Sequence, residues 1–338
     1  MQRYQIMRFG LEHLTLAEAA DPTPGPGQVV VSIKAVSLNY RDMMMVAGQY
    51  DPNLAAGRVP CSDGAGVVLA TGPGVRGFKV GDRVVSSFFQ NWTDGPISSA
   101  KMRGALGGDV DGTLTSHAVL SETGLSKIPD GLSFVQAATL PCAAVTAWNA
   151  LFGGPRPVGL GDSVLVQGTG GVSVFALQLA RAAGARVIIT SSSDEKLARA
   201  KAMGAEVTIN YKSTPDWEKP AREASGGGVD VVVEVGGAGT LGKSIKAVRT
   251  GGTIALIGVL AGVRGEVDTV SILMRSIDVR GINVGSLAML QSVVRAVGTT
   301  GGGVEPVIDR VFPFALAKEA FGYMKSGAHM GKVVIELP

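Results

Sequence analysis

Cysteine and histidine are both scarce in this chain of 338 residues, which contains two cysteines and three histidines. Two cysteines cannot form a four-thiolate zinc site, so any metal centre must be argued position by position. An excess of charge of one sign is also lacking, since the chain has 31 basic and 28 acidic residues and no basic cluster stands out. This balance argues against a nucleic-acid or anionic-membrane partner.

Long apolar runs are missing as well. The longest, residues 254–263, is interrupted by two glycines and is far shorter than the ~20 residues that span a bilayer. Residues 1–13 alternate polar and apolar side chains and do not form a secretory signal. We therefore expect a cytoplasmic protein in which Cys61 and Cys142 are reduced.

Glycine, in contrast, is abundant, with 48 residues. Through the first 130 residues it separates β-branched runs at 28–36, 64–70 and 82–88, a pattern typical of a β-barrel or sandwich. From residue 162 the pattern changes to alternating strands and helices. The predicted strands are 163–167, 186–190, 206–209, 230–234 and 253–257, and the predicted helices are 172–183, 194–203 and 241–249.

Continuous Val/Ile runs in these later strands indicate burial on both faces, hence an α/β domain with a doubly wound parallel sheet. Near the end of the chain, residues 314–338 contain a helix-like segment and a strand at 332–337. This tail is expected to complete the first, β-rich domain.

A glycine-rich turn follows the strand 163–167 and opens a helix, which is the context of a dinucleotide-phosphate site. Its residues are Gly168, Thr169, Gly170, Gly171 and Val172, and Ser173 stands where the third glycine of the fingerprint usually lies. A small residue there still permits close packing of the helix on the strand. The alternative is a tight turn that binds no ligand.

The end of the next strand is where an acid would bind the ribose hydroxyl of NAD. This chain instead offers Ser191, Ser192 and Lys196, with Tyr211 closing the following strand. Hydroxyls and a lysine suit a 2′-phosphate, so NADP is preferred to NAD. In the alternative reading, Ser192 and Glu195 form a capping box and Lys196 is solvated.

Several motifs together resemble the medium-chain dehydrogenase/reductase superfamily. They are the turn at Gly168–Ser173, Asn39-Tyr-Arg-Asp42, Pro60–Gly66, Gly77–Val84 and Ala137–Pro141 with Ala147-Trp148. The resemblance implies a GroES-like catalytic domain at 1–130, completed by 314–338, and a Rossmann domain at 131–313. It also implies an active site between the two.

By the same resemblance, the zinc-dependent branch requires a cysteine where this chain has Asn39 and a His-Glu pair where it has Ser62 and Asp63. Only Cys142 matches a ligand position, and residues 90–112 lack the four cysteines of a structural zinc lobe. We therefore predict no zinc, because a single thiolate cannot replace three protein ligands. Cys142 is then interpreted as a buried small hydrophobe, with a reactive thiol as the alternative.

Without zinc, hydride transfer from NADPH to a quinone or an α,β-unsaturated carbonyl remains feasible, because the acceptor spreads the incoming charge onto its own oxygen. The resemblance implies that Asn39 contacts the nicotinamide or the substrate carbonyl. Tyr40 and Tyr50 are candidate proton donors, or simply packed tyrosines. Asp42 is a candidate catalytic residue, or a surface partner of Arg41.

The resemblance also assigns residues to the nicotinamide, namely Thr146, Gly258, Val259, Asn283 and Lys332. Each could equally be an ordinary turn or capping residue. The strand 278–282 would lie at a sheet edge where two subunits commonly pair, so a homodimer is expected.

Two other functions remain open at this point. One is an NAD(P)-dependent alcohol or aldehyde dehydrogenase, and the other is an NADPH-binding sensor or structural protein with little turnover.

Overall fold

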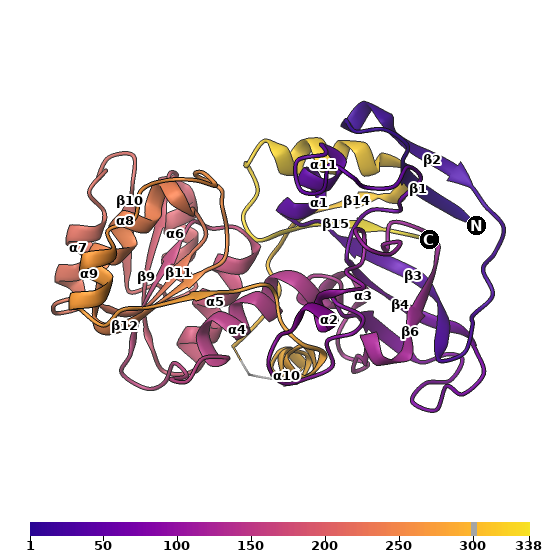
Figure 1. The fold of residues 1–338 in the computed structure, drawn as a ribbon, viewed down its shortest axis with the longest axis horizontal. Coiled ribbons are helices and arrows are strands. Elements are labelled where there is room, and N and C mark those ends of the chain that lie inside the picture. Colours follow the sequence, from indigo (N-terminus) through magenta and orange to yellow (C-terminus); the bar gives the residue numbers. More distant parts are fainter. Residues whose placement is uncertain (299–302) are drawn as a thin grey trace. The chain divides into compact units, whose positions relative to one another are not determined.

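The structure is a computed structural model that describes residues 1–298 and 303–338, and these form two compact units. The first unit contains residues 1–145, 284–298 and 306–338, and the second contains residues 146–283 and 303–305. The chain is thus an α/β protein with a β-rich unit and a unit built on a parallel sheet (Figure 1).

The β-rich unit is built around β3 (Gln28–Ser37), which pairs antiparallel with three neighbours. Its sheet has the order β14-β15-β3-β4-β5-β7, and β6 also pairs with β3. The other strands of this unit are β1 (Gln2–Ile6), β2 (Leu14–Glu18), β4 (Asp63–Thr71), β5 (Arg83–Ser86), β6 (His117–Ser121), β7 (Leu125–Lys127), β14 (Ile308–Pro313) and β15 (Lys332–Glu336). Its helices and helical turns are η1 (Leu11–His13), α1 (Tyr40–Val46), α2 (Ser99–Met102), η2 (Glu122–Gly124), α3 (Phe134–Ala137), the π-helical turn η3 (Leu140–Ala144), α10 (Leu287–Gly298), η4 (Phe314–Leu316) and α11 (Ala317–Lys325).

The end of the chain belongs to this first sheet, as the tail's strand pattern led us to expect. β15 pairs antiparallel with β3, with Val334 opposite Ser37, and β14 pairs parallel with β15. Figure 1 shows α11 beside these two strands. The first and last parts of the sequence therefore share one hydrophobic core, in which Val31 and Ile335 are both buried.

The second unit has a six-stranded parallel sheet in the order β10-β9-β8-β11-β12-β13. Its strands are β8 (Ser163–Gln167), β9 (Arg186–Ser191), β10 (Val207–Asn210), β11 (Val229–Glu234), β12 (Val248–Leu256) and β13 (Asp278–Gly281). Its helices are α4 (Val145–Phe152, whose first residue belongs to the first unit), α5 (Gly171–Ala182), α6 (Asp194–Ala202), α7 (Glu218–Ala224), α8 (Ala238–Ala247) and α9 (Thr269–Met274). The predicted parallel sheet is confirmed, and its central strand β8 is buried along its whole length because helices cover it.

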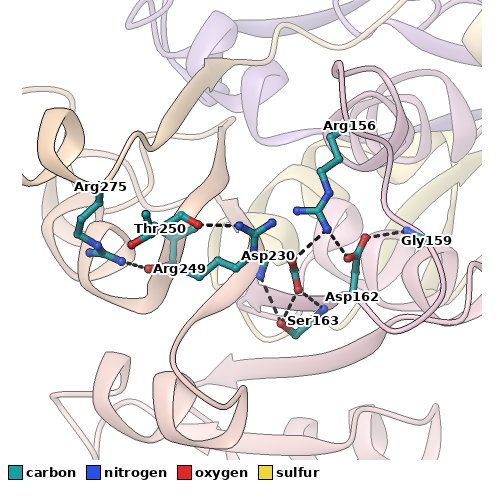
Figure 2. A network of polar contacts seen from close by, with 9 residues as sticks. Arg156, Gly159, Asp162, Ser163, Asp230, Arg249, Thr250 and Arg275 are labelled. Atoms are coloured by element: carbon teal, nitrogen blue, oxygen red, sulfur yellow. Dashed lines mark hydrogen bonds and ion pairs between the residues drawn. The ribbon is translucent and has the colours of Figure 1, made fainter.

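One polar network ties together the amino ends of β8, β11 and β12 (Figure 2). The Asp230 carboxylate accepts hydrogen bonds from the backbone and hydroxyl of Ser163, at 2.8 and 3.0 Å, and from Arg249 Nε at 2.7 Å. Arg156 bridges Asp230 and Asp162, at 3.3 and 2.8 Å. Because parallel strands share their polarity, the opposite edge of this sheet collects the strand carboxyl ends, where ligands bind in such folds.

The unit boundaries differ from the expected ones at residues 130 and 313. Residues 131–145 lie with the β-rich unit, because α3 packs on β3 and β4. The segment that begins at Val284 also lies there, and Leu287 N donates to Trp92 O at 2.9 Å. In the part of the chain that the structure describes, no helix has both the length and the apolar character needed to cross a membrane.

Candidate active site

The predicted phosphate cradle lies at the carboxyl end of β8, where the chain turns into α5. Gly168 has a φ of 71°, in the left-handed region that favours glycine. A Cβ added at Gly170 would meet no atom within 4 Å, and one at Gly168 would meet only the Ser173 hydroxyl at 3.9 Å. The N-cap of α5 is Gly170, so no side chain caps the helix. Open space beside an uncapped helix N-terminus fits a phosphate group, so these residues could hold a dinucleotide.

Ser173 explains why the third glycine of the fingerprint is dispensable here. Its side chain is buried, and its Oγ donates to Gln167 O at 2.7 Å, which joins α5 to the end of β8. Thr169 is also buried, whereas Gly171 and Val172 are partly exposed at the start of the helix. A small side chain therefore preserves the close approach of helix and strand.

A buried carboxylate that the sequence analysis did not single out lies at the carboxyl end of β11. Glu234 is fully buried and accepts hydrogen bonds through both oxygens. Its donors are Gln167 Nε2 (2.7 Å), Gly236 N (2.7 Å), Gly237 N (3.0 Å), Thr240 Oγ1 (2.5 Å) and Ser244 Oγ. This carboxylate holds the turn between β11 and α8. The sequence signal that could have identified Glu234 is an acidic residue at the end of an apolar strand, just before Gly236-Gly237.

Two predicted nicotinamide residues follow β12. A Cβ at Gly258 would lie 2.3 Å from Val235 O, so packing within the unit alone requires glycine at this position. Val259 is 40% exposed. Their contact with a nicotinamide stays a prediction.

The predicted adenosine end of the cofactor site lies where β9 and β10 finish side by side. Ser191 is buried, and its backbone O accepts from Tyr211 N at 3.0 Å. Ser192 and Lys196 are partly buried. These residues bring hydroxyl groups and a lysine to the carboxyl ends of β9 and β10.

The capping box assigned to Ser192 is wrong. The N-cap of α6 is Ser193, whose Oγ accepts from Lys196 N at 3.3 Å. Asp194, the first carboxylate after β9, accepts from Asn210 Nδ2 at 2.7 Å. That contact engages one of its two carboxylate oxygens within the protein.

In the β-rich unit, Asn39 and Lys332 meet although they are 293 residues apart. Asn39 precedes α1, and Lys332 begins β15. The Lys332 Nζ donates to Asn39 Oδ1 and to Leu38 O, both at 2.6 Å, and both side chains are buried. A buried ammonium is stable only when its hydrogen bonds and charge are compensated, and these two oxygens supply the hydrogen bonds.

Asp63, which opens β4, supplies compensating charge. It is fully buried, with Oδ1 accepting from Ser62 Oγ at 2.6 Å and Oδ2 from Cys142 N at 3.1 Å. Burial raises the pKa of Asp63, and the Lys332 charge opposes this rise. Desolvation, followed by the Asp63 charge, raises the pKa of the Cys142 thiol, which disfavours a reactive thiolate. The Cys142 side chain is nevertheless partly exposed, so the full burial expected from the sequence is not observed.

These residues occupy the positions that resemble the zinc ligands, and they do not fit zinc. The Asn39 oxygen is bound by an ammonium, and both Asp63 oxygens are engaged within the protein. Over residues 1–298 and 303–338, no three His, Cys, Asp or Glu side chains gather closely enough to hold a metal ion. A catalytic zinc takes three protein ligands, and the donors here cannot provide them.

Asp42 is not the surface residue of the alternative reading, because its side chain is 1% exposed. It lies in the first turn of α1, where its Oδ2 accepts from Asn39 N at 2.8 Å. Burial raises the pKa of Asp42 to about 7, with the Arg41 charge opposing and the Asp63 charge adding to the rise.

The two candidate proton donors are exposed, Tyr40 at 45% and Tyr50 at 50%. Arg41 lies over the Tyr50 ring at 5.2 Å and over the Phe88 ring at 4.7 Å, and its Nη1 donates to Leu106 O at 2.8 Å. Arg41 thus holds Tyr50 by a cation–π contact.

Two further predicted residues lie in the second unit. Thr146 is buried in α4, and Asn283 is exposed after β13. The next residue, Val284, has a φ of 54°, which is a strained conformation for a β-branched side chain. Such strain often marks a functional segment, so it singles out the chain beside Asn283.

Comparison with known proteins agrees with this architecture. Residues 25–130 match the family model described as alcohol dehydrogenase GroES-like domain, and residues 171–299 match the model described as zinc-binding dehydrogenase. A zinc-type alcohol dehydrogenase-like protein of Schizosaccharomyces pombe is 48% identical over 318 residues, which cover 92% of this chain and 91% of that protein.

Two solved structures have closely similar folds. The structure of an NAD-dependent alcohol dehydrogenase is 36% identical with a TM-score of 0.90 and covers 100% of both chains. That of the crotonyl-CoA carboxylase/reductase AntE in complex with NADP is 26% identical with a TM-score of 0.88, covering 99% of this chain and 94% of that one. The zinc-named family model begins at residue 171, beyond Asn39, Asp63 and Cys142, so its match does not involve those positions.

Proposed function

We propose that this chain, which belongs to the medium-chain dehydrogenase/reductase superfamily, transfers a hydride from NADPH to a quinone or an α,β-unsaturated carbonyl compound without zinc. Membership of the family makes the chain an NAD(P)-dependent oxidoreductase. The finer assignment concerns the cofactor, the absence of metal and the class of acceptor.

The observation that carries the proposal is the Lys332–Asn39 contact at the place of a metal ligand. Oxidation of an alcohol needs a strong Lewis acid or base to stabilise the alkoxide, and an ammonium that is already hydrogen-bonded to Leu38 and Asn39 is a weak substitute. A conjugated acceptor needs less help, because its own oxygen takes up the charge of the hydride.

Bound NADPH would supply the hydride. The chain's own residues would then position the acceptor and deliver a proton. Tyr40 and Tyr50 are the proposed proton donors, since their side chains are exposed and Tyr50 is held against Arg41. Asp42, whose pKa is raised to about 7, is a further candidate to hold and release a proton beside Asn39.

The preference for NADPH rests on Ser191, Ser192, Lys196 and Tyr211 at the ends of β9 and β10. It is supported by the NADP complex of AntE and opposed by the NAD-dependent relative. We expect Lys196→Ala to weaken NADPH binding by about tenfold and NADH binding by less than twofold. Equal losses for the two cofactors, measured by fluorescence titration, would refute the 2′-phosphate assignment.

An alcohol or aldehyde dehydrogenase is the second candidate, favoured by the names of the relatives. Metal analysis of the purified protein, combined with NADPH-oxidation assays over quinones, enones and aldehydes, separates the two. Stoichiometric zinc together with alcohol oxidation would refute the proposed zinc-free reduction of quinones or enones. Tight NADPH binding without turnover of any acceptor would instead indicate a sensor or structural protein.

We also propose a homodimer in the cytoplasm. Support for the dimer comes from β13, which forms one edge of the parallel sheet, and from exposed apolar side chains in the preceding segment. The most exposed of these are Val263, Val270, Leu273 and Met274. Light scattering tests the dimer, and an Asp substitution at Leu273 should shift it toward monomer.

Support for a reducing compartment comes from Cys61 and Cys142, which are both free thiols.

A further inference from the structure

A buried glutamine, Gln167, ends β8 and lies directly before the glycine-rich turn of the proposed phosphate site. Its Nε2 group donates to Glu234 Oε2 at 2.7 Å and to Ser244 Oγ at 2.8 Å. Its Oε1 accepts from the backbone nitrogens of Val235 and Gly236, at 3.2 and 3.3 Å. A glutamine amide offers two donor hydrogens and two acceptor lone pairs. All of them are used inside the chain, so this side chain joins β8 to the turn after β11 rather than binding a ligand.

The backbone of Gln167 is tied to the start of α5 as well. Its carbonyl oxygen accepts from Ser173 Oγ at 2.7 Å, and the next residue, Gly168, has the left-handed φ of 71°. The side chain and the backbone of this one residue therefore connect α5, the glycine-rich turn and the segment that follows β11. A displacement of the β11 turn would be transmitted to the turn that is proposed to hold the pyrophosphate.

The loop after β12 lies on the same segment. Backbone oxygens of residues 234–236 accept four hydrogen bonds from the backbone of residues 257–261, at 2.7–3.3 Å. A Cβ at Gly258 would lie 2.3 Å from Val235 O, so the approach is as close as a glycine permits. This loop carries Gly258 and Val259, the predicted nicotinamide residues. Its position is therefore set by the β11 turn, and the glutamine joins that turn to β8.

The carboxylate of Glu234 divides its contacts between the two sides of this link. Its Oε2 accepts from Gln167 and from Ser244 Oγ. Its Oε1 accepts from three donors of the α8 turn, namely Gly236 N, Gly237 N and Thr240 Oγ1. Because Glu234 is fully buried, loss of the glutamine amide would leave polar groups in the interior without partners. The turn would have to shift to satisfy them.

We propose that Gln167 is a positioning residue, which acts through Glu234 to fix the spacing between the glycine-rich turn and the loop 257–261. A dinucleotide that binds both segments at once depends on this spacing, because its pyrophosphate and its nicotinamide are parts of one molecule. A fragment that binds at one end alone does not. The inference rests on the proposed function for the cofactor and extends it, because Gln167 and Glu234 need not touch that cofactor.

The test compares NADPH with adenosine 2′,5′-bisphosphate, which lacks the pyrophosphate and the nicotinamide. Gln167→Met keeps a side chain of similar length and removes its hydrogen bonds. We expect this variant to bind NADPH about tenfold more weakly, and to bind the bisphosphate within about twofold of the wild type, in calorimetric titrations. If the wild type prefers NADH, the same comparison is made between NADH and AMP.

Gln178→Met is the matched control. Gln178 is a second buried glutamine of the same unit, in α5, and its amide is hydrogen-bonded to the backbone nitrogen and oxygen of Glu305, at 2.6 and 2.8 Å. The substitution removes a similarly buried amide that is bonded to another segment. It should lower the midpoint of thermal unfolding and leave NADPH affinity within about twofold of the wild type.

Exchange of the two side chains provides a rescue experiment. Gln167→Glu alone places two carboxylates side by side and should weaken NADPH binding at least as much as Gln167→Met. Adding Glu234→Gln puts an NH₂ donor at the Oε2 position, where it faces the new carboxylate, and keeps the oxygen that faces the α8 turn. The double variant should bind NADPH at least about threefold more tightly than Gln167→Glu.

Equal losses of affinity for NADPH and for the bisphosphate would overturn the inference, and so would a Gln167→Met variant with wild-type affinity. If Gln167→Met does not fold, the exchange decides. A double variant that fails to fold, or that binds NADPH no better than Gln167→Glu, then overturns the inference, as does a wild type that binds neither dinucleotide. A wild type that binds the dinucleotide but reduces no acceptor refutes the proposed function alone, since the spacing is measured by binding constants.

Discussion

Replacement of Gly170 by alanine should weaken cofactor binding while leaving the fold intact. The Gly170 backbone has φ −75° and ψ −176°, which alanine adopts without strain. The added Cβ would meet no protein atom within 4 Å. Reduced freedom of the unfolded chain stabilises by about 0.4–1 kcal/mol, and the poorer helix cap of alanine offsets a similar amount. The free energy of unfolding should therefore change by less than about 1 kcal/mol.

Cofactor binding should respond much more strongly, because the space that the methyl group fills is the space proposed for the pyrophosphate. We expect NADPH affinity to fall by at least about tenfold. At a cofactor concentration of 100 times the wild-type Kd, binding stabilises the wild type by about 2.7 kcal/mol. A tenfold weaker variant would be stabilised by only about 1.4 kcal/mol under the same conditions.

Urea unfolding with and without NADPH measures both the free energy of unfolding and its increase on cofactor binding. Gly242→Ala is the matched control, since Gly242 lies exposed in α8 and its added Cβ also meets nothing within 4 Å. It should stabilise the protein by roughly 1 kcal/mol and leave the cofactor-dependent increment unchanged. A Gly170→Ala variant that keeps the full increment would refute the phosphate cradle.

Three other substitutions test the energetics of single residues. Asp42→Asn removes a group whose pKa is about 7 in the folded protein and ~3.9 in the unfolded chain. Because the folded protein holds this proton more tightly, the wild type loses stability as the pH rises. Its free energy of unfolding relative to the variant should therefore fall by up to about 4 kcal/mol between pH 4 and 7. Parallel urea-unfolding curves across that pH range would contradict the assigned pKa. Glu234→Gln places an NH₂ group among hydrogen-bond donors and should lower the free energy of unfolding by about 2–4 kcal/mol, whereas a loss below about 1 kcal/mol would show that the buried carboxylate is dispensable. Ser276→Gly relieves a φ of 48° after α9 and should raise stability by about 0.5 kcal/mol in thermal unfolding; a lower Tm would argue against strain there.

Local patterns were sufficient to predict most of the second unit. The strand 163–167 agrees with β8 at both ends, and the helical stripe from 172 to 183 agrees with α5 to within one residue. These elements are defined by the periodicity of neighbouring residues and by glycines at their ends. The helix predicted at 241–249 was less accurate, because β12 already begins at Val248, where apolar residues suit either structure.

The candidate site residues were harder to assign from local patterns. Asp42 was left open as a surface partner of Arg41, yet it is buried. In the alternative interpretation Ser192 capped α6, yet Ser193 provides this cap. The cap depends on backbone geometry that does not distinguish two neighbouring serines in a sequence pattern, and the burial of Asp42 depends on packing between segments that are distant in the chain.

The sequence by itself determined the α/β architecture and the glycine-rich turn at the end of β8, because each depends on residue types at short spacing. The mismatch with a zinc ligand set came from the resemblance to the family, which says which positions to compare. Only the tertiary structure decided that Lys332 binds Asn39 and that Asp63 lies beside them. Those contacts join segments 293 and 79 residues apart, as Lys332 with Asn39 and Asp63 with Cys142. They depend on the register of β15 against β3 and of β3 against β4, which is set by packing of the whole sheet.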